Sequence, residues 1–157
     1  MSQTLTQMIS NLTQLANQLP EIVRQSVEET KEAYLSLNAE QWGKGINKDG
    51  SFIALDGAPF YRPYTIEQKE KFGGSGLGRV TDRVTLFMTG ATYKSADLKV
   101  TNSEINVTFG TPYAPDLVER TTDKIFGLTT DDMDTYRRVF KVPFQKKIES
   151  VTKLKFV

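Results

Sequence analysis

One short stretch of the chain, DRVTLFMTGATYKS at residues 82–95, has the layout of a turn that could carry chemistry. An apolar run of strand-like composition stops at Thr89-Gly90, and Tyr93 and Ser95 follow within a few residues. Such a turn could hold a nucleophile, bind a phosphate group or form a backbone corner without chemistry. A nucleophile needs a nearby base, and the chain contains no histidine and no cysteine. We therefore interpret Thr89-Gly90 as a structural corner.

The absence of histidine and cysteine restricts the rest of the chain in the same way. It removes disulfides, thiolate nucleophiles, the commonest general base and the commonest zinc ligand. An enzyme would need carboxylates such as Asp82, Asp116 and Glu119 to meet in a pocket. We expect no catalytic residue, no cofactor and no metal site, and we interpret the chain as a protein that is not an enzyme.

Two clusters have residue types that bind ions. The glycine-rich run at residues 73–78 follows a predicted short helix and lacks the Lys-Ser/Thr of a phosphate-binding loop, so we interpret it as a flexible loop. Asp131, Asp132 and Asp134 lack the alternate spacing and the glycine of a calcium loop. They lie where a helix begins, and the positive end of the helix dipole accounts for them.

The formal net charge of +1 at pH 7 is the sum of two segments of opposite sign. Residues 1–40 are acidic, whereas residues 137–157 contain Glu149 as their only acidic residue. This polarity suits head-to-tail contacts between copies. It also leaves open a DNA-binding module that would use Arg137, Arg138, Lys146 and Lys147.

A long helical segment opens the chain. Apolar residues recur at helical spacing from Leu5 to Leu37, and Pro20 predicts a kink or a short break, so we expect helical structure over residues 4–41. This apolar stripe is long enough that part of it could face a neighbouring subunit, although burial against the chain's own core is the commoner arrangement.

The remainder predicts short mixed elements. We expect a β-hairpin or β-arm over residues 43–60, a helix capped by Thr65, and a strand or extended segment at residues 79–88 with Thr89 as the cap of the next turn. Alternating apolar residues predict a β-hairpin over residues 97–110, and a short helix is expected at 116–120. Thr129 should cap a C-terminal helix that Pro143 bends or ends.

The chain of 157 residues fits one α+β domain. No apolar run approaches the ~20 residues that a membrane-spanning helix needs, and residues 1–10 do not have the pattern of a secretion signal. We therefore expect a soluble protein that is made in the cytoplasm.

Four segments occur in an order that resembles the bacteriophage virion morphogenesis proteins, also called tail-completion or head-tail joining proteins. The resemblance covers about residues 40–132. The segments are EQWGKGINKDG, YRPYTIEQK, VTLFMTGATYKS and VTFGTPYAPDLVERTTDKIFGLTTDD. The last three are similar to the family's Pro-x-Thr-x-x-x-Lys element, to its Leu-x-x-Thr-Gly-x-x-x-x-Ser signature, and to its Gly-x-x-Tyr-Ala segment followed by Phe-x-Gly and acidic residues.

The resemblance implies one virion morphogenesis domain over residues 1–157, with a twisted antiparallel sheet packed by helices. It implies a structural subunit that forms a ring at the neck of the virion, assembles in the host bacterial cytoplasm and joins the DNA-filled head to the tail. Implied partners are further copies of the chain, the portal-side connector, tail-side proteins and, without specificity, packaged DNA, but no membrane. A minor tail or tail-terminator protein is the alternative.

We expect the loop 73–78 and the arm 43–60 to become ordered on assembly. Candidate assembly contacts are Trp42, Tyr61, Tyr64, Gly74, Gly76, Tyr113, Arg137, Arg138, Lys146 and Lys147.

Overall fold

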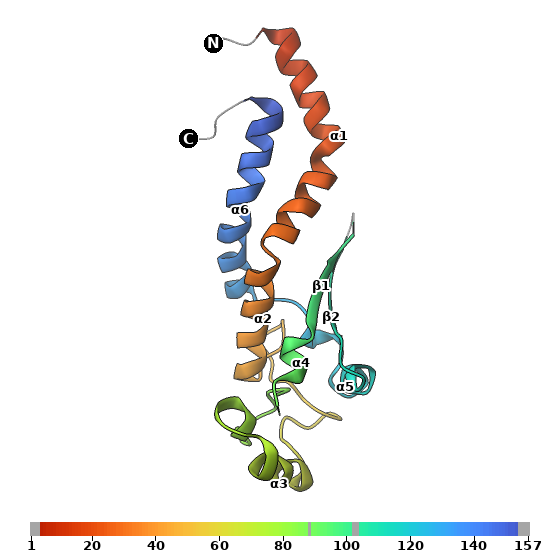
Figure 1. The fold of residues 1–157 in the computed structure, drawn as a ribbon, viewed down its shortest axis with the longest axis vertical. Coiled ribbons are helices and arrows are strands. Elements are labelled where there is room, and N and C mark those ends of the chain that lie inside the picture. The colour runs from red at the N-terminus through yellow and green to blue at the C-terminus, as the bar shows by residue number, and fades with distance from the viewer. Residues whose placement is uncertain (1–3, 88, 102–103, 154–157) are drawn as a thin grey trace.

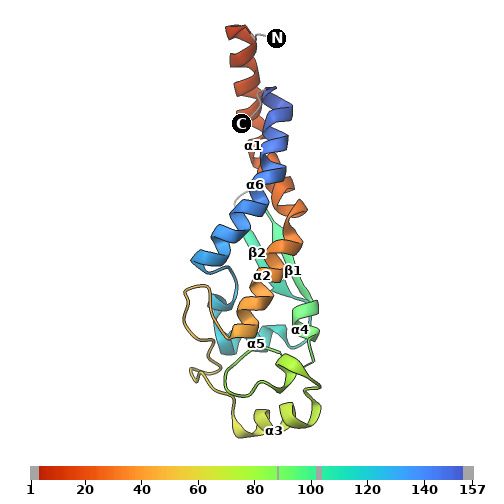
Figure 2. The same cartoon turned by 90° about the vertical axis from the view of Figure 1, so that its left-hand side faces the viewer.

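The protein is elongated, with a pair of long helices projecting from a mixed body. The computed structural model describes residues 4–87, 89–101 and 104–153. Helix α1 (Leu5–Glu29) lies beside the C-terminal helix α6 (Thr130–Thr152), and both chain ends lie at the same end of the molecule (Figure 1). Viewed from the side, the body tapers into this projecting pair, which we call the α1–α6 pair (Figure 2).

Helix α1 remains continuous through Pro20. Its first turn is fixed by Thr4, whose side chain accepts the amide hydrogen of Gln7 while the Gln7 side chain accepts that of Thr4. Figure 1 shows a bend along α1, so the proline produces the predicted kink and not the alternative, a break. The break comes at Thr30, whose hydroxyl donates to the carbonyl of Ser26 (2.8 Å), and α2 (Lys31–Lys44) follows.

The body packs around the indole ring of Trp42, which is fully buried. Its ring contacts Tyr93 and Phe109 edge-on, with centroids 5.4 and 4.9 Å away, and its N–H donates to the carbonyl of Ile125 (2.6 Å). Phe109 belongs to the antiparallel pair β1 (Ala96–Val100) and β2 (Ile105–Phe109). The predicted hairpin is therefore confirmed, although its Asn102-Ser103 turn lies outside the described residues.

The expected strand before Thr89 does not form in the described residues 79–87. Polar side chains hold this segment in place of a partner strand: the amide of Thr85 donates to the Tyr61 hydroxyl (2.9 Å), and the Tyr93 hydroxyl donates to the Thr85 carbonyl. The cap of α4 (Ala91–Lys94) is Gly90 and not Thr89. Gly90 has a φ of 85°, and a Cβ there would lie 3.0 Å from the Phe87 ring, so glycine is required.

Two helices differ from their predicted bounds. Helix α3 (Pro63–Phe72) begins at Pro63 and not after Thr65, because proline suits the first helical position. Helix α5 (Ala114–Thr121) likewise begins earlier than residue 116. Helix α6 is capped by Thr129 as predicted, and because it continues through Pro143 to Thr152, the proline does not end it.

The predicted arm and the glycine-rich loop contain little regular structure. The arm at residues 43–60 has isolated bridges, Ile46 to Phe52 and Leu55 to Ala58, where a β-hairpin or β-arm was expected. The 3-10 turn η1 (Gly76–Arg79) falls at the end of the glycine-rich run, and a second, η2 (Asp123–Ile125), follows α5.

Gln41 joins α2 to the start of α6. Its amide nitrogen donates to the Gly127 carbonyl (3.1 Å), and its carbonyl oxygen accepts from the amide of Thr129 (2.9 Å). We predict that Gln41→Leu lowers the free energy of unfolding by about 1–3 kcal/mol, because the half-buried Thr129 amide loses its partner. Chemical denaturation measures the change. Glu40→Leu places the same side chain at an exposed position of α2 as a control, and an equal loss in both variants would contradict this role of Gln41.

Candidate functional site

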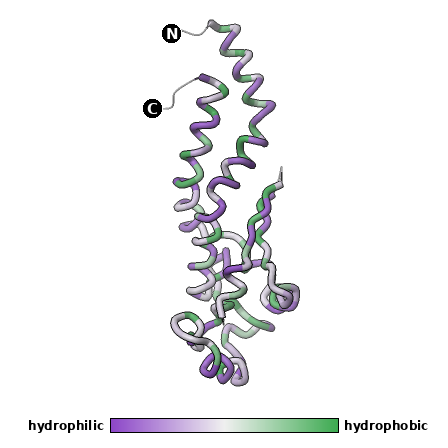
Figure 3. Tube along the Cα trace, in the orientation of Figure 1, coloured by the Kyte–Doolittle hydropathy of each residue, from purple (hydrophilic) through white to green (hydrophobic). Residues whose placement is uncertain are grey.

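Helix α1 carries a line of exposed apolar residues on the side away from its contacts with α6. The exposed fractions are 57% for Ile9, 54% for Leu12 and 40% for Leu19. Hydrophobic residues recur along α1 to its outer end (Figure 3). The full line, which we call the α1 seam, has alternating steps of four and three residues and consists of Leu5, Ile9, Leu12, Ala16, Leu19 and Val23.

Helix α6 contacts a different side of α1. The Asn11 side chain donates to the carbonyl of Thr152 (3.1 Å), and Glu29 forms an ion pair with Lys147 (2.5 Å). At 3.6 residues per turn, Asn11 and Glu29 point about 120° away from the middle of the α1 seam. The apolar stripe of α1 is therefore wider than the surface that α6 covers.

Helix α6 has an exposed apolar patch of its own. Val139 and Val142 are 42% and 54% exposed, and the exposed residues Arg138 and Lys146 lie beside them on the helix. We call Val139 and Val142 the α6 patch. The α1–α6 pair thus offers two apolar surfaces, one uncharged and one edged with positive charge.

The predicted basic residues do not form one face. Arg137 pairs with Asp134 on the same helix (2.7 Å), and Lys147 pairs with Glu29, whereas Arg138 and Lys146 are exposed. The acidic and basic segments also lie side by side in the α1–α6 pair and not at opposite ends of the molecule. Part of the charge polarity that suggested head-to-tail contacts is therefore neutralised within the chain.

Some of the aromatic residues and glycines predicted as contacts lie on the surface, and others lie in the core. Tyr64 is 71% exposed, and Gly74 and Gly76 are exposed with positive φ. Trp42 and Tyr61 are buried, because the interior of the body is built around these rings. We therefore correct our interpretation of these two residues: in the isolated chain they are core residues and not exposed contacts for another subunit.

Tyr113 lies at a cavity of about 340 Å³ between α3, the segment before α4, and α5. Lys69, Thr89 and Tyr113 come from three of the four segments that carry the family resemblance, and all three line this cavity. The other lining residues are Leu55, Tyr61, Thr65, Leu86, Phe87, Ala91, Thr92 and Leu117. Segments far apart in the sequence thus meet at what we call the Lys69 cavity.

Lys69 is 1% exposed, which is unusual for a lysine. Its ammonium group donates to the Phe87 carbonyl and lies 4.8 Å from the centroid of the Tyr61 ring. Burial lowers the pKa of Lys69 to about 8, because the charged ammonium group is removed from water and the neutral form is favoured. Burial also raises the pKa of the neighbouring Tyr93, because the negatively charged phenolate would lose its hydration.

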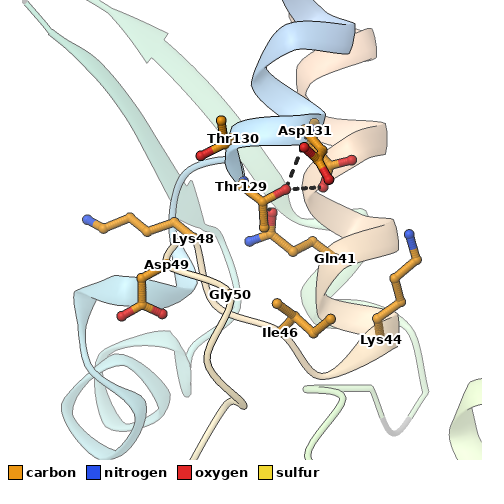
Figure 4. Close-up of a pocket in the computed structure, with 10 residues that line it drawn as sticks. Gln41, Lys44, Ile46, Lys48, Asp49, Gly50, Thr129, Thr130 and Asp131 are labelled. Atoms are coloured by element: carbon orange, nitrogen blue, oxygen red, sulfur yellow. Dashed lines mark hydrogen bonds between the residues drawn. The ribbon is translucent and has the colours of Figure 1, made fainter.

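A second, polar cleft of about 480 Å³ lies between the end of α2, the turn at residues 47–50 and the first turn of α6 (Figure 4). Thr129 and Asp132 line it, and Asp132 accepts a hydrogen bond from the Thr129 hydroxyl (3.0 Å) while its amide donates back to that oxygen (3.3 Å). These bonds confirm that Thr129 caps α6 and account for one of the clustered aspartates by helix geometry.

The part of the chain that the structure describes contains no group of three Asp or Glu side chains placed to hold a metal ion. Asp82 pairs with Arg83 (3.1 Å) and Asp116 with Arg120 (3.6 Å), both at exposed positions. Within the same described ranges, no helix has the length and apolar character that crossing a bilayer requires.

The candidate contacts predicted from the sequence included neither the residues of the α1 seam nor Lys69. The sequence did indicate the seam, since the N-terminal helix is predicted amphipathic and the first 20 residues of the chain include no charged side chain. Nothing in the sequence indicated that Lys69 is buried, because the residue pattern of TIEQKEK is that of a solvated helix face.

Comparison with known proteins gives no match to a family model, to a curated protein or to a solved structure. Any functional statement about this chain therefore rests on its residues and its geometry.

The buried Lys69 predicts a stability that depends on pH. Between about pH 8 and pH 10.5 the folded protein has released the Lys69 proton while the unfolded chain still holds it, so the free energy of unfolding rises with pH. We predict that wild type gains about 2–3 kcal/mol relative to Lys69→Met from pH 7 to pH 10.5. Denaturation of both proteins across this range measures the gain. Lys71→Met, at an exposed position of α3, is the control, and a constant difference between wild type and Lys69→Met would contradict the burial argument.

Proposed function

We propose that this chain is a non-enzymatic structural subunit of a tailed bacteriophage virion, which forms a ring at the neck and joins the DNA-filled head to the tail. The order of the four family-like segments supports the phage assignment. The observation that carries the structural role is the α1 seam, because a helix that projects from the body with an uncharged apolar line is suited to contact another subunit.

The spacing of the α1 seam favours a helix as its partner. Alternating steps of four and three residues average 3.5 residues per turn, which is the repeat of helices that pack side by side over many turns. Fully burying one Leu or Ile side chain contributes about 1.5–3 kcal/mol, so even partial cover of the exposed seam is a substantial driving force. A second copy of this chain provides a long helix with an exposed apolar surface.

A ring requires that each copy use two different surfaces. A contact between two α1 seams would be two-fold and would stop at a dimer, whereas a contact between the α1 seam of one copy and the α6 patch of the next can repeat until it closes. The two surfaces also differ in charge, because Arg138 and Lys146 lie beside the α6 patch, whereas the first 20 positions of the chain, which include most of the α1 seam, have no charged side chain.

Purified phage particles test the assignment to the virion. We expect this polypeptide to be detected by mass spectrometry in particles of the phage that encodes it, and electron microscopy with a specific antibody should place it at the neck. Labelling along or at the end of the tail would favour the minor tail or tail-terminator alternative, which uses the same surfaces. Its absence from purified particles would contradict the proposal.

We predict that Ile9→Glu with Leu12→Glu weakens self-association about 100-fold or more, because two charges enter an apolar contact. Sedimentation analysis of the full chain over a range of concentrations measures this. Ser10→Glu with Gln14→Glu adds the same charge to the opposite face of α1 and should leave association unchanged. Equal weakening by both pairs would show that charge, and not the α1 seam, controls assembly.

A further inference from the structure

The Lys69 cavity holds a cation without a matching anion. An ammonium group has three donors; the Phe87 carbonyl accepts one bond, and the Tyr61 ring face lies near the group. Among the described residues, no carboxylate forms an ion pair with Lys69. A buried charge in this position is costly unless something pairs with it.

The rest of the lining combines apolar walls with the hydroxyl group of Thr65. Leu55, Leu86 and Leu117 contribute aliphatic surface. Thr65 lies one turn before Lys69 on α3, lines the same cavity, and its hydroxyl has no hydrogen-bond partner within the described residues. The exposed residues Thr89 and Tyr113 border the cavity, so it is open to solvent on their side.

We propose that the Lys69 cavity binds a carboxylate carried on an apolar chain. The carboxylate accepts hydrogen bonds from the Lys69 ammonium and the Thr65 hydroxyl, and the apolar chain lies against the leucine walls. One carboxylate supplies the single negative charge that Lys69 lacks. A phosphate would bring further charge into apolar surroundings, and an alcohol would leave the ammonium without an anion.

The size of the cavity limits the ligand. A volume of about 340 Å³ lies at the small end of the range for ligand sites in proteins, which suits a chain of medium length such as that of octanoate. The same chemistry is available from a free aliphatic acid or from the terminal residue of another protein. Octanoate and N-acetyl-leucine serve as probes for these two sources. The inference does not depend on the proposed virion role.

Calorimetric titration of the full chain at about pH 7 tests the site. We expect octanoate, N-acetyl-leucine or both to bind at one site per chain, and octan-1-ol and N-acetyl-leucinamide to bind at least about tenfold more weakly than the corresponding acids. Stronger binding of octanoate indicates a free acid as the natural ligand, and stronger binding of N-acetyl-leucine indicates a protein terminus. If neither acid binds at millimolar concentration, the proposal is wrong.

Two variants locate the binding. Lys69→Met keeps a long apolar side chain but removes the charge, and we expect it to weaken binding of the acid about tenfold or more while octan-1-ol binds as before. Thr65→Val should weaken binding of the acid several-fold. Lys71→Met changes an exposed lysine on the same helix and is the matched control. Undiminished binding of the acid by Lys69→Met would overturn the proposal.

The wild-type protein provides a test that needs no variant. Raising the pH from about 7 to about 9.5 should weaken binding of the acid as Lys69 loses its proton, while octan-1-ol binding stays constant. Tyr61 and Tyr113 are the other titratable groups that line the cavity. Glu67, Glu70 and Lys71 of α3 and Arg79 of η1, which packs on α3, are exposed. Binding of the acid that does not change with pH would contradict the role given to Lys69.

Discussion

The width of the apolar stripe on α1 is the constraint on which this structure depends. One side of α1 is used within the chain, where Asn11 and Glu29 bond to α6 and Ile22 is buried, and the other side, the α1 seam, is left exposed. No charged residue occurs in the first 20 positions, so nothing on the outer part of α1 repels a second copy. The same stripe therefore holds the α1–α6 pair together and leaves it with a surface that another subunit can cover.

The body contains a second feature of this kind, a buried charge. In its packing around Trp42, the indole N–H and the side-chain amide groups of Asn38 and Gln41 all donate to carbonyl oxygens of the segment before α6. Lys69 differs, because its charge is buried beside an open cavity with a carbonyl and a ring but no described carboxylate around it. The exposed α1 seam and the buried charge of Lys69 are the two features on which the proposed contacts depend.

The elements that follow from local periodicity could be predicted from the sequence. The alternation in β1 and β2 and the capping of α6 by Thr129 are such local signals, and the structure confirms them. Predictions that depend on packing were less accurate. The segment before Thr89 has strand composition but is held by Tyr61 and Tyr93, and the buried state of Lys69 arises from residues far along the chain. A sequence pattern contains no information about which of its faces a distant segment will cover.

Cysteine cross-linking can show whether the α1 seam of one copy packs on the α6 patch of another, because the chain has no cysteine of its own. A variant with Leu12→Cys and Val142→Cys places one thiol in the α1 seam and the other in the α6 patch. If the seam of each copy packs on the α6 patch of the next, mild oxidation should produce a ladder of dimers, trimers and larger species, while Leu12→Cys alone remains uncrosslinked. Dimers from Leu12→Cys alone, or no cross-linked species from the double variant, would contradict a ring built on these two surfaces.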